Sequence, residues 1–72
     1  MMPRYVVINE IDRDDFERKW QIPYGYGECE VHLDLEDAIN ELETYYSSSD
    51  WIVEEVTDDG RQVVYRGGLQ EA

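Results

Sequence analysis

The sequence predicts an α+β domain: a small antiparallel or mixed sheet of three or four strands, one main helix packed on a face of the sheet, and a short N-terminal helix. Three observations predict this class. Short runs of β-branched and aromatic residues are typical of strands, one segment has apolar residues at helical spacing, and an Asp-Asp-Gly sequence joins the last two strands. A chain of 72 residues suits a single domain (1–72) whose core is too small to hide a deep cofactor site.

The N-terminal segment predicts a strand followed by a short helix. Residues 5–8 are apolar and largely β-branched, as in strands. For the helix we expect Asp12 as the N-terminal cap, with Phe16 and Trp20 one turn apart on an apolar edge. The helix should end before Pro23, because the residue that precedes a proline avoids helical backbone angles.

A loop and a second strand follow. Residues 24–27 are Tyr-Gly-Tyr-Gly, and the two tyrosines of this loop are candidates for exposure at a binding surface, with a place in the core as the alternative. Residues 28–33 alternate between polar and apolar, which predicts a half-buried strand. The buried face of this strand should carry Cys29, Val31 and Leu33.

The main helix has the clearest pattern in the chain. Apolar residues recur at spacings of three and four over residues 35–46 and form one stripe: Leu35, Ala38, Ile39, Leu42, Tyr45 and Tyr46. Asp34 is the expected N-terminal cap, and the serines at 47–49 are the expected end of the helix.

The last third of the chain predicts a hairpin. Residues 51–57 and 61–66 are strand-like and are joined through the Asp-Asp-Gly turn sequence. If the second Asp and the Gly form a two-residue turn, Val56 pairs with Val63. Residues 67–72 are expected to be a frayed tail.

The net charge of the chain is −12, from 18 Asp and Glu against 6 Lys and Arg. This balance argues against direct binding to nucleic acid or to an anionic membrane, because both need clustered cations. No apolar run is long enough to span a membrane, and the start of the chain lacks the apolar stretch of a signal peptide. The single cysteine cannot form an internal disulfide, so we expect a cytoplasmic protein.

The negative charge is confined to the middle of the chain. Residues 20–60 contain no Lys or Arg, whereas the segments on either side are nearly balanced. On the main helix the acids lie opposite the apolar stripe, and Asp37 and Glu41 form a like-charge pair four residues apart. Glu41 and Glu43 also lie in the C-terminal half of the helix, where the helix dipole favours cations. Carboxylates at positions where they destabilise the helix indicate a functional surface.

We therefore predict an acidic surface that binds a partner. Its main members are Glu28, Glu30, Asp34, Glu36, Asp37, Glu41 and Glu43. A secondary group comprises Glu54, Glu55, Asp58, Asp59, Tyr24 and Tyr26. The complement of such a surface is one rich in Lys and Arg, which nucleic-acid-binding proteins present, and we expect the chain itself to be a monomer or a weak dimer.

No enzymatic or metal-binding motif is apparent in the sequence. The acids around Asp12 lack the glycine of a calcium loop, because the sixth position is Glu17. Cys29 and His32 point to opposite faces of the expected strand, which argues against both a zinc site and a nucleophile–base pair. The Tyr-Gly-Tyr-Gly loop lacks the strand-turn-helix context of a phosphate loop. We expect no enzyme, no cofactor and no metal.

In size, acidity, α/β pattern and lack of a catalytic motif, the whole chain resembles the small acidic anti-CRISPR and anti-restriction proteins of phages and mobile elements. The resemblance rests on no shared motif, so it transfers no role to a numbered residue. It implies a DNA mimic that blocks target-DNA binding by a CRISPR effector complex or a restriction enzyme, in the cytoplasm of a bacterial host. The alternatives are a generic protein–protein adaptor and a small acidic domain, including a salt-adapted one, without nucleic-acid mimicry.

Overall fold

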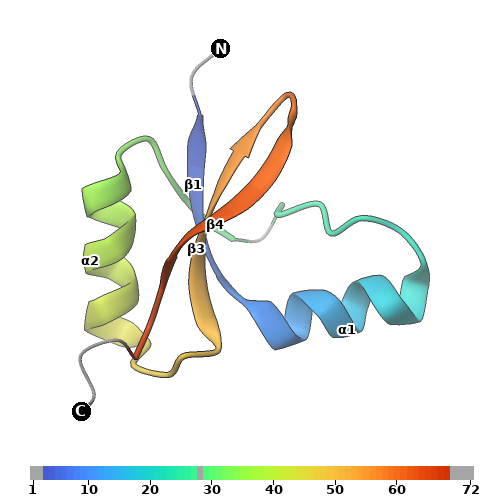
Figure 1. Ribbon diagram of the computed structural model, residues 1–72, viewed down its shortest axis with the longest axis horizontal. Coiled ribbons are helices and arrows are strands. Elements are labelled where there is room, and N and C mark those ends of the chain that lie inside the picture. The colour runs from blue at the N-terminus through green and yellow to red at the C-terminus, as the bar shows by residue number, and fades with distance from the viewer. Residues whose placement is uncertain (1–2, 28, 69–72) are drawn as a thin grey trace.

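The computed structural model describes residues 3–27 and 29–68, and its elements are drawn in Figure 1. Their order is β1 (Arg4–Asn9), α1 (Glu10–Trp20), β2 (Glu30–His32), α2 (Leu35–Tyr45), β3 (Trp51–Thr57) and β4 (Gly60–Arg66). The four strands form one sheet in the order β2-β1-β3-β4, and every neighbouring pair is antiparallel. The predicted α+β class is confirmed.

The two central strands of the sheet, β1 and β3, are buried on both of their faces. Val6, Val7 and Ile8 are buried in succession, and Ile52 and Val53 are buried opposite them. Central strands that are covered on both sides are near-continuous apolar runs, which explains the absence of alternation in β1. The molecule therefore has one small core on each side of the sheet.

The helix α2 lies over the first of these cores. Val7 and Val53 from the sheet meet Ala38 and Leu42 from α2, and all four residues are buried. The expected cap is confirmed, since the Asp34 carboxylate accepts a hydrogen bond from the backbone N–H of Glu36 at 2.8 Å.

The C-terminal turn of α2 differs from the expected apolar stripe. Tyr45 is 68% exposed and does not belong to the core. Tyr46 has left the helix, and its ring stacks on that of Trp51 with 3.7 Å between the ring centroids. Because the helix ends at Tyr45, the periodicity of α2 no longer fixes the direction of Tyr46.

The opposite face of the sheet carries the second core, formed by Val6, Ile8 and Ile52. Tyr24, Tyr26 and Cys29, from the segment that joins α1 to β2, pack against it. Figure 1 shows α1 on this side of the sheet and α2 on the other. We use the terms α1 side and α2 side for these two faces of the sheet.

The cap of α1 is Asn9 and not Asp12 as expected. The Asn9 side chain accepts hydrogen bonds from the N–H groups of Ile11 and Asp12, at 3.0 and 3.1 Å. Asn9 ends β1 in an extended conformation and so can cap the helix at once. Asn and Asp are nearly equivalent as caps, so residue type alone does not favour Asn9 over Asp12.

The second strand is shorter than expected, and its apolar side chains are not buried. β2 has three residues and is an edge strand. Val31 is 45% exposed and Leu33 is 68% exposed. Glu28, the expected first residue of this strand, lies outside the described residues.

The register of the hairpin also differs from the expected one. Thr57 pairs with Gly60, so Asp58 and Asp59 form the turn. Val56 therefore pairs with Arg61, and Val63 pairs with Glu54 beside an irregularity of the register. The expected Val56–Val63 pair is wrong, because the two-residue turn lies at residues 58 and 59, one residue earlier than expected.

Gly67, the first residue of the expected tail, is part of the fold. Gly67 is buried, and its N–H donates to the carbonyl of Trp51 at 2.8 Å. A Cβ atom at this position would lie 2.6 Å from the carbonyl oxygen of Ser48, so the close approach requires glycine. Residues 69–72 lie outside the described residues.

Candidate acidic interface

All six Lys and Arg of the chain lie on the α1 side of the sheet. Residues paired across an antiparallel ladder share a face, so the cations of the strands can be placed through their partners. Arg4 and Arg61 both pair with Val56, and Arg66 pairs with Ile52. Val56 and Ile52 belong to the core of the α1 side. The other three of the six Lys and Arg are in α1 itself: Arg13, Arg18 and Lys19.

The α2 side carries carboxylates without any Lys or Arg. Glu30 pairs with Val7, and Glu55 pairs with Tyr5, which packs against the core beneath α2. Both carboxylates therefore share a side with α2. Together with the acids of α2 and its cap they form what we call the acidic face: Glu30, Asp34, Glu36, Asp37, Glu41, Glu43 and Glu55. Glu41 and Glu55 are half-buried and the others are exposed.

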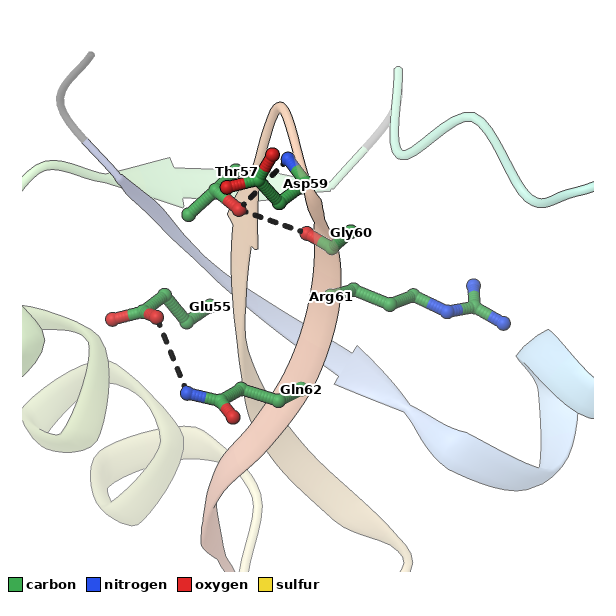
Figure 2. A pocket seen from close by; sticks show the side chains of 6 residues that line it. All are labelled: Glu55, Thr57, Asp59, Gly60, Arg61 and Gln62. Carbon is green, nitrogen blue, oxygen red and sulfur yellow. Dashed lines mark hydrogen bonds between the residues drawn. The ribbon is translucent and has the colours of Figure 1, made fainter.

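The β3–β4 hairpin divides its charges between the two sides. Figure 2 shows Glu55 and Gln62 pointing from the hairpin toward α2, and Arg61 pointing the opposite way. The Gln62 amide donates to the Glu55 carboxylate at 3.3 Å. These side chains line a shallow hollow of about 300 Å³ with Thr57, Asp59 and Gly60. Asp58 and Asp59 lie exposed in the turn at the end of the hairpin.

Two tyrosines that were not predicted as site residues hold carboxylates of the acidic face. The Tyr65 hydroxyl donates to Glu43 at 2.9 Å, and the Tyr5 hydroxyl donates to Glu55 at 3.3 Å. The hydrogen bond to Glu43 raises the pKa of Tyr65, and burial followed by the charge of Glu55 raises the pKa of Tyr5. The sequence signal for Tyr5 was its two-residue spacing from Val7, which places both on one face of β1.

Glu54, predicted as a partner-binding residue, is not available to a partner. Its exposed fraction is 1%, and it lies on the α1 side at 2.5 Å from Arg13. The hydroxyl of Tyr26 donates to the same carboxylate at 2.9 Å. The expected exposure of the loop tyrosines is also wrong, because Tyr24 and Tyr26 are half-buried with their rings edge to face.

The ion pairs between described residues all lie on the α1 side. Arg61 binds both carboxylate oxygens of Glu17, at 2.7 and 2.9 Å, and Arg66 binds both oxygens of Glu10, at 2.9 and 3.0 Å. Within the described part of the chain, no Lys or Arg nitrogen lies within 4 Å of six carboxylates of the acidic face: Glu30, Asp34, Glu36, Asp37, Glu41 and Glu55. The α1 side therefore carries a network of ion pairs, whereas these six carboxylates of the acidic face have no such partner among the described residues.

The Glu17–Arg61 pair predicts a specific loss of stability in acid. The hydrogen bonds from Arg61, and then that from the Tyr24 N–H, lower the pKa of Glu17 from 4.5 to about 2. Because the folded-state pKa is the lower one, this pair stabilises the fold above about pH 4.5 and its contribution disappears as the pH falls toward 2. Glu17→Gln should flatten the pH dependence of the unfolding free energy between these values, as measured by urea denaturation. An unchanged slope would contradict the assignment.

The described residues contain no group of three or more His, Cys, Asp and Glu side chains arranged to hold a metal ion. No helix within residues 3–27 and 29–68 is long and apolar enough to cross a membrane. Comparisons of the chain with protein families, with curated proteins and with solved structures found no match.

Proposed function

We propose that this protein is a non-enzymatic inhibitor that binds the basic nucleic-acid-binding surface of another protein in place of DNA. The target would be a subunit of a CRISPR effector complex or a restriction enzyme, met in the cytoplasm of a bacterial host. The observation that carries the proposal is the separation of charge across the sheet. All six Lys and Arg lie on the α1 side, and the charged side chains of the acidic face are all carboxylates.

The dimensions of the acidic face suit a short stretch of nucleic acid backbone. Nine residue steps separate Asp34 from Glu43, which amounts to about 14 Å along a helix axis. DNA presents phosphates about every 3.4 Å of axis per strand, so this length corresponds to about four spacings between successive phosphates. When a basic groove binds this face, it would release the same counterions as when it binds DNA.

The acidic face is also partly held in place before any partner binds. Glu43 and Glu55 are fixed by tyrosine hydroxyls, and Asp34 is fixed by its role as helix cap. Side chains that are already ordered lose less conformational entropy when they bind.

The adaptor alternative would use a different part of the surface. Tyr24 and Tyr26 no longer favour it, because they are half-buried against the second core. The large apolar side chains that are exposed at the end of α1 are Trp20 and Ile22, at 57% and 55%. An adaptor that used them would depend on Trp20 and would respond only weakly to salt.

The test is capture of binding proteins from a bacterial lysate by the immobilised chain, followed by mass spectrometry. A matched variant carries Glu36→Gln, Asp37→Asn, Glu41→Gln and Glu43→Gln, which we call the amide variant. It preserves side-chain size and removes four charges from α2. We expect the wild-type chain to retain a nucleic-acid-binding protein that the amide variant does not retain. Retention of the same protein by both chains would contradict the proposal, and loss with Trp20→Ala alone would favour the adaptor.

A further inference from the structure

The helix α1 is attached to the sheet by a row of charges where a helix of this kind usually has apolar residues. Glu10, Arg13 and Glu17 are spaced by three and four residues, so they lie on one face of α1. Each of them forms an ion pair with a strand. Glu10 binds Arg66 of β4, Arg13 binds Glu54 of β3, and Glu17 binds Arg61 of β4.

Apolar contacts contribute little to the attachment of α1. The buried residue of this helix is Arg13, at 8% exposed. Ile11 and Trp20 are 50% and 57% exposed. Phe16 of α1 packs edge to face on Tyr24, with 5.2 Å between the ring centroids. The helix therefore rests on the connecting segment and on its ion pairs, with little burial of apolar surface.

The segment 21–27 that follows α1 contains two backbone conformations that are costly for their residues. Gln21 has φ 60° and Tyr26 has φ 59°, which is the left-handed region. The glycines on either side of Tyr26 do not take this conformation. A residue other than Gly, Asn or Asp is strained in this region of backbone angles. The contacts of segment 21–27 must therefore offset the free-energy cost of these two conformations.

The core beneath α2 does not depend on this attachment. Val7, Ala38, Leu42 and Val53 pack together on the other side of the sheet. The strands β1 and β3 pair over six residue positions, from Arg4 opposite Val56 to Asn9 opposite Trp51. Opening on the α1 side leaves this unit with its own core and its own hydrogen-bonded ladder.

We propose that α1 and the segment 21–27 form a cover that opens and closes as one unit over Val6, Ile8 and Ile52, while α2 and the sheet stay folded. Opening separates the three ion pairs of Glu10, Arg13 and Glu17. Ionic strength controls the open fraction, because salt screens the two more exposed pairs, Glu10–Arg66 and Glu17–Arg61. The device is independent of the acidic face, which lies on the other side of the sheet.

Amide hydrogen exchange on the full chain tests the proposal. The variant is Glu17→Gln, which keeps an oxygen to accept the Tyr24 N–H and loses the charge that holds Arg61. The matched control is Arg18→Gln, because Arg18 pairs with Asp15 within α1 and is 76% exposed. Exchange is measured at constant pH in about 50 mM and about 1 M salt.

We expect amides of residues 11–20 and of Tyr24 and Tyr26 to exchange about tenfold faster in Glu17→Gln, since a hydrogen-bonded charge is lost. The same amides should exchange faster at high salt in the wild-type chain, while those of α2 and β3 keep their rates. Arg18→Gln should match the wild type. Equal acceleration in α1, α2 and β3 would overturn the proposal, because the whole fold would then open together. Rates that change neither with salt nor with Glu17→Gln would also overturn it.

The single cysteine supplies a second measurement. Cys29 is half-buried, packs against the second core, and lies 3.8 Å from the Tyr24 hydroxyl. Its reaction with iodoacetamide should accelerate in parallel with the exchange of α1, after correction for the effect of salt on a free thiol. Gln21→Gly should slow both processes several-fold, because glycine relieves the left-handed backbone at the end of α1. Faster opening in Gln21→Gly would contradict the role of strain.

Discussion

Replacement of Arg13 with methionine is expected to destabilise the fold by about 3–5 kcal/mol, because it leaves the Glu54 carboxylate buried without its main cation. Glu54 is 1% exposed and lies 2.5 Å from Arg13. The hydrogen bond from Tyr26 remains, but the Arg61 Nε is 3.9 Å away, and the two Nη atoms of Arg61 already bind Glu17. A loss of this size is a large part of the total stability of a small domain. Urea denaturation followed by circular dichroism measures it.

A second variant distinguishes an unpaired charge from lost packing. Arg13→Met combined with Glu54→Leu removes both charges and keeps the volume of the buried cluster nearly constant. Buried ion pairs replaced by apolar groups are often neutral or stabilising, so the double variant should recover most of the loss. If Arg13→Met alone costs less than about 1 kcal/mol, the pair is not buried as the structure has it. If the double variant is as unstable as the single one, the uncompensated charge is not the cause.

The amide variant of α2 is expected to bind the captured partner about a hundredfold more weakly than the wild type. Exposed charge pairs contribute about 0.2–1 kcal/mol each, and four of them together approach the 2.7 kcal/mol of such a factor. The association rate should also depend less on salt, because charges of this kind act mainly by steering. Titration calorimetry and stopped-flow measurements at several salt concentrations give both quantities.

The control for this variant removes charge from the other side of the molecule. Asp12→Asn with Asp15→Asn neutralises two exposed acids of α1, which lies across the sheet from the acidic face. We expect this control to change the affinity by less than about threefold. The amide variant itself should remain folded, because it removes the repulsion between Asp37 and Glu41, worth about 0.2–0.5 kcal/mol. Equal losses in both variants would mean that net charge, and not the acidic face, determines binding.

The elements with strong local patterns were predictable from the sequence. The periodicity of α2 and the cap at Asp34 both follow from short-range rules, and the structure has them where expected apart from the last turn. The cap of α1 was not predictable, because Asn9 and Asp12, three residues apart, are equally suitable cap residues. The prediction of the hairpin register was wrong for a similar reason, since Asp-Asp and Asp-Gly are both acceptable turn sequences.

The environment of Glu54 could have been inferred in part from the sequence. Glu54 lies two residues from Ile52 and from Val56, so strand alternation places all three on one face. That spacing indicated a buried carboxylate, which requires a partner of opposite charge. Nothing in the sequence identified Arg13 as that partner, because the contact joins residues 41 positions apart on elements whose packing depends on the whole fold.

The separation of charge across the sheet could not be predicted from the sequence alone. The sequence locates the negative charge in residues 20–60, but it does not show which strands pair or which side of the sheet each acid faces. The pairing of Arg4 and Arg61 with Val56 places these cations across the sheet from α2. The acids of the middle segment are divided accordingly, with Glu54 on the α1 side and Glu55 on the α2 side.

The most direct test of the proposed mimicry is competition with DNA for the captured partner. A fluorescent duplex bound to that partner is titrated with the wild-type chain and with the amide variant, and fluorescence anisotropy reports the bound DNA. We expect the wild type to displace the duplex fully and the amide variant to require about a hundredfold higher concentration. A ternary complex in which the partner holds DNA and this protein together, or equal displacement by the two chains, would contradict the proposal.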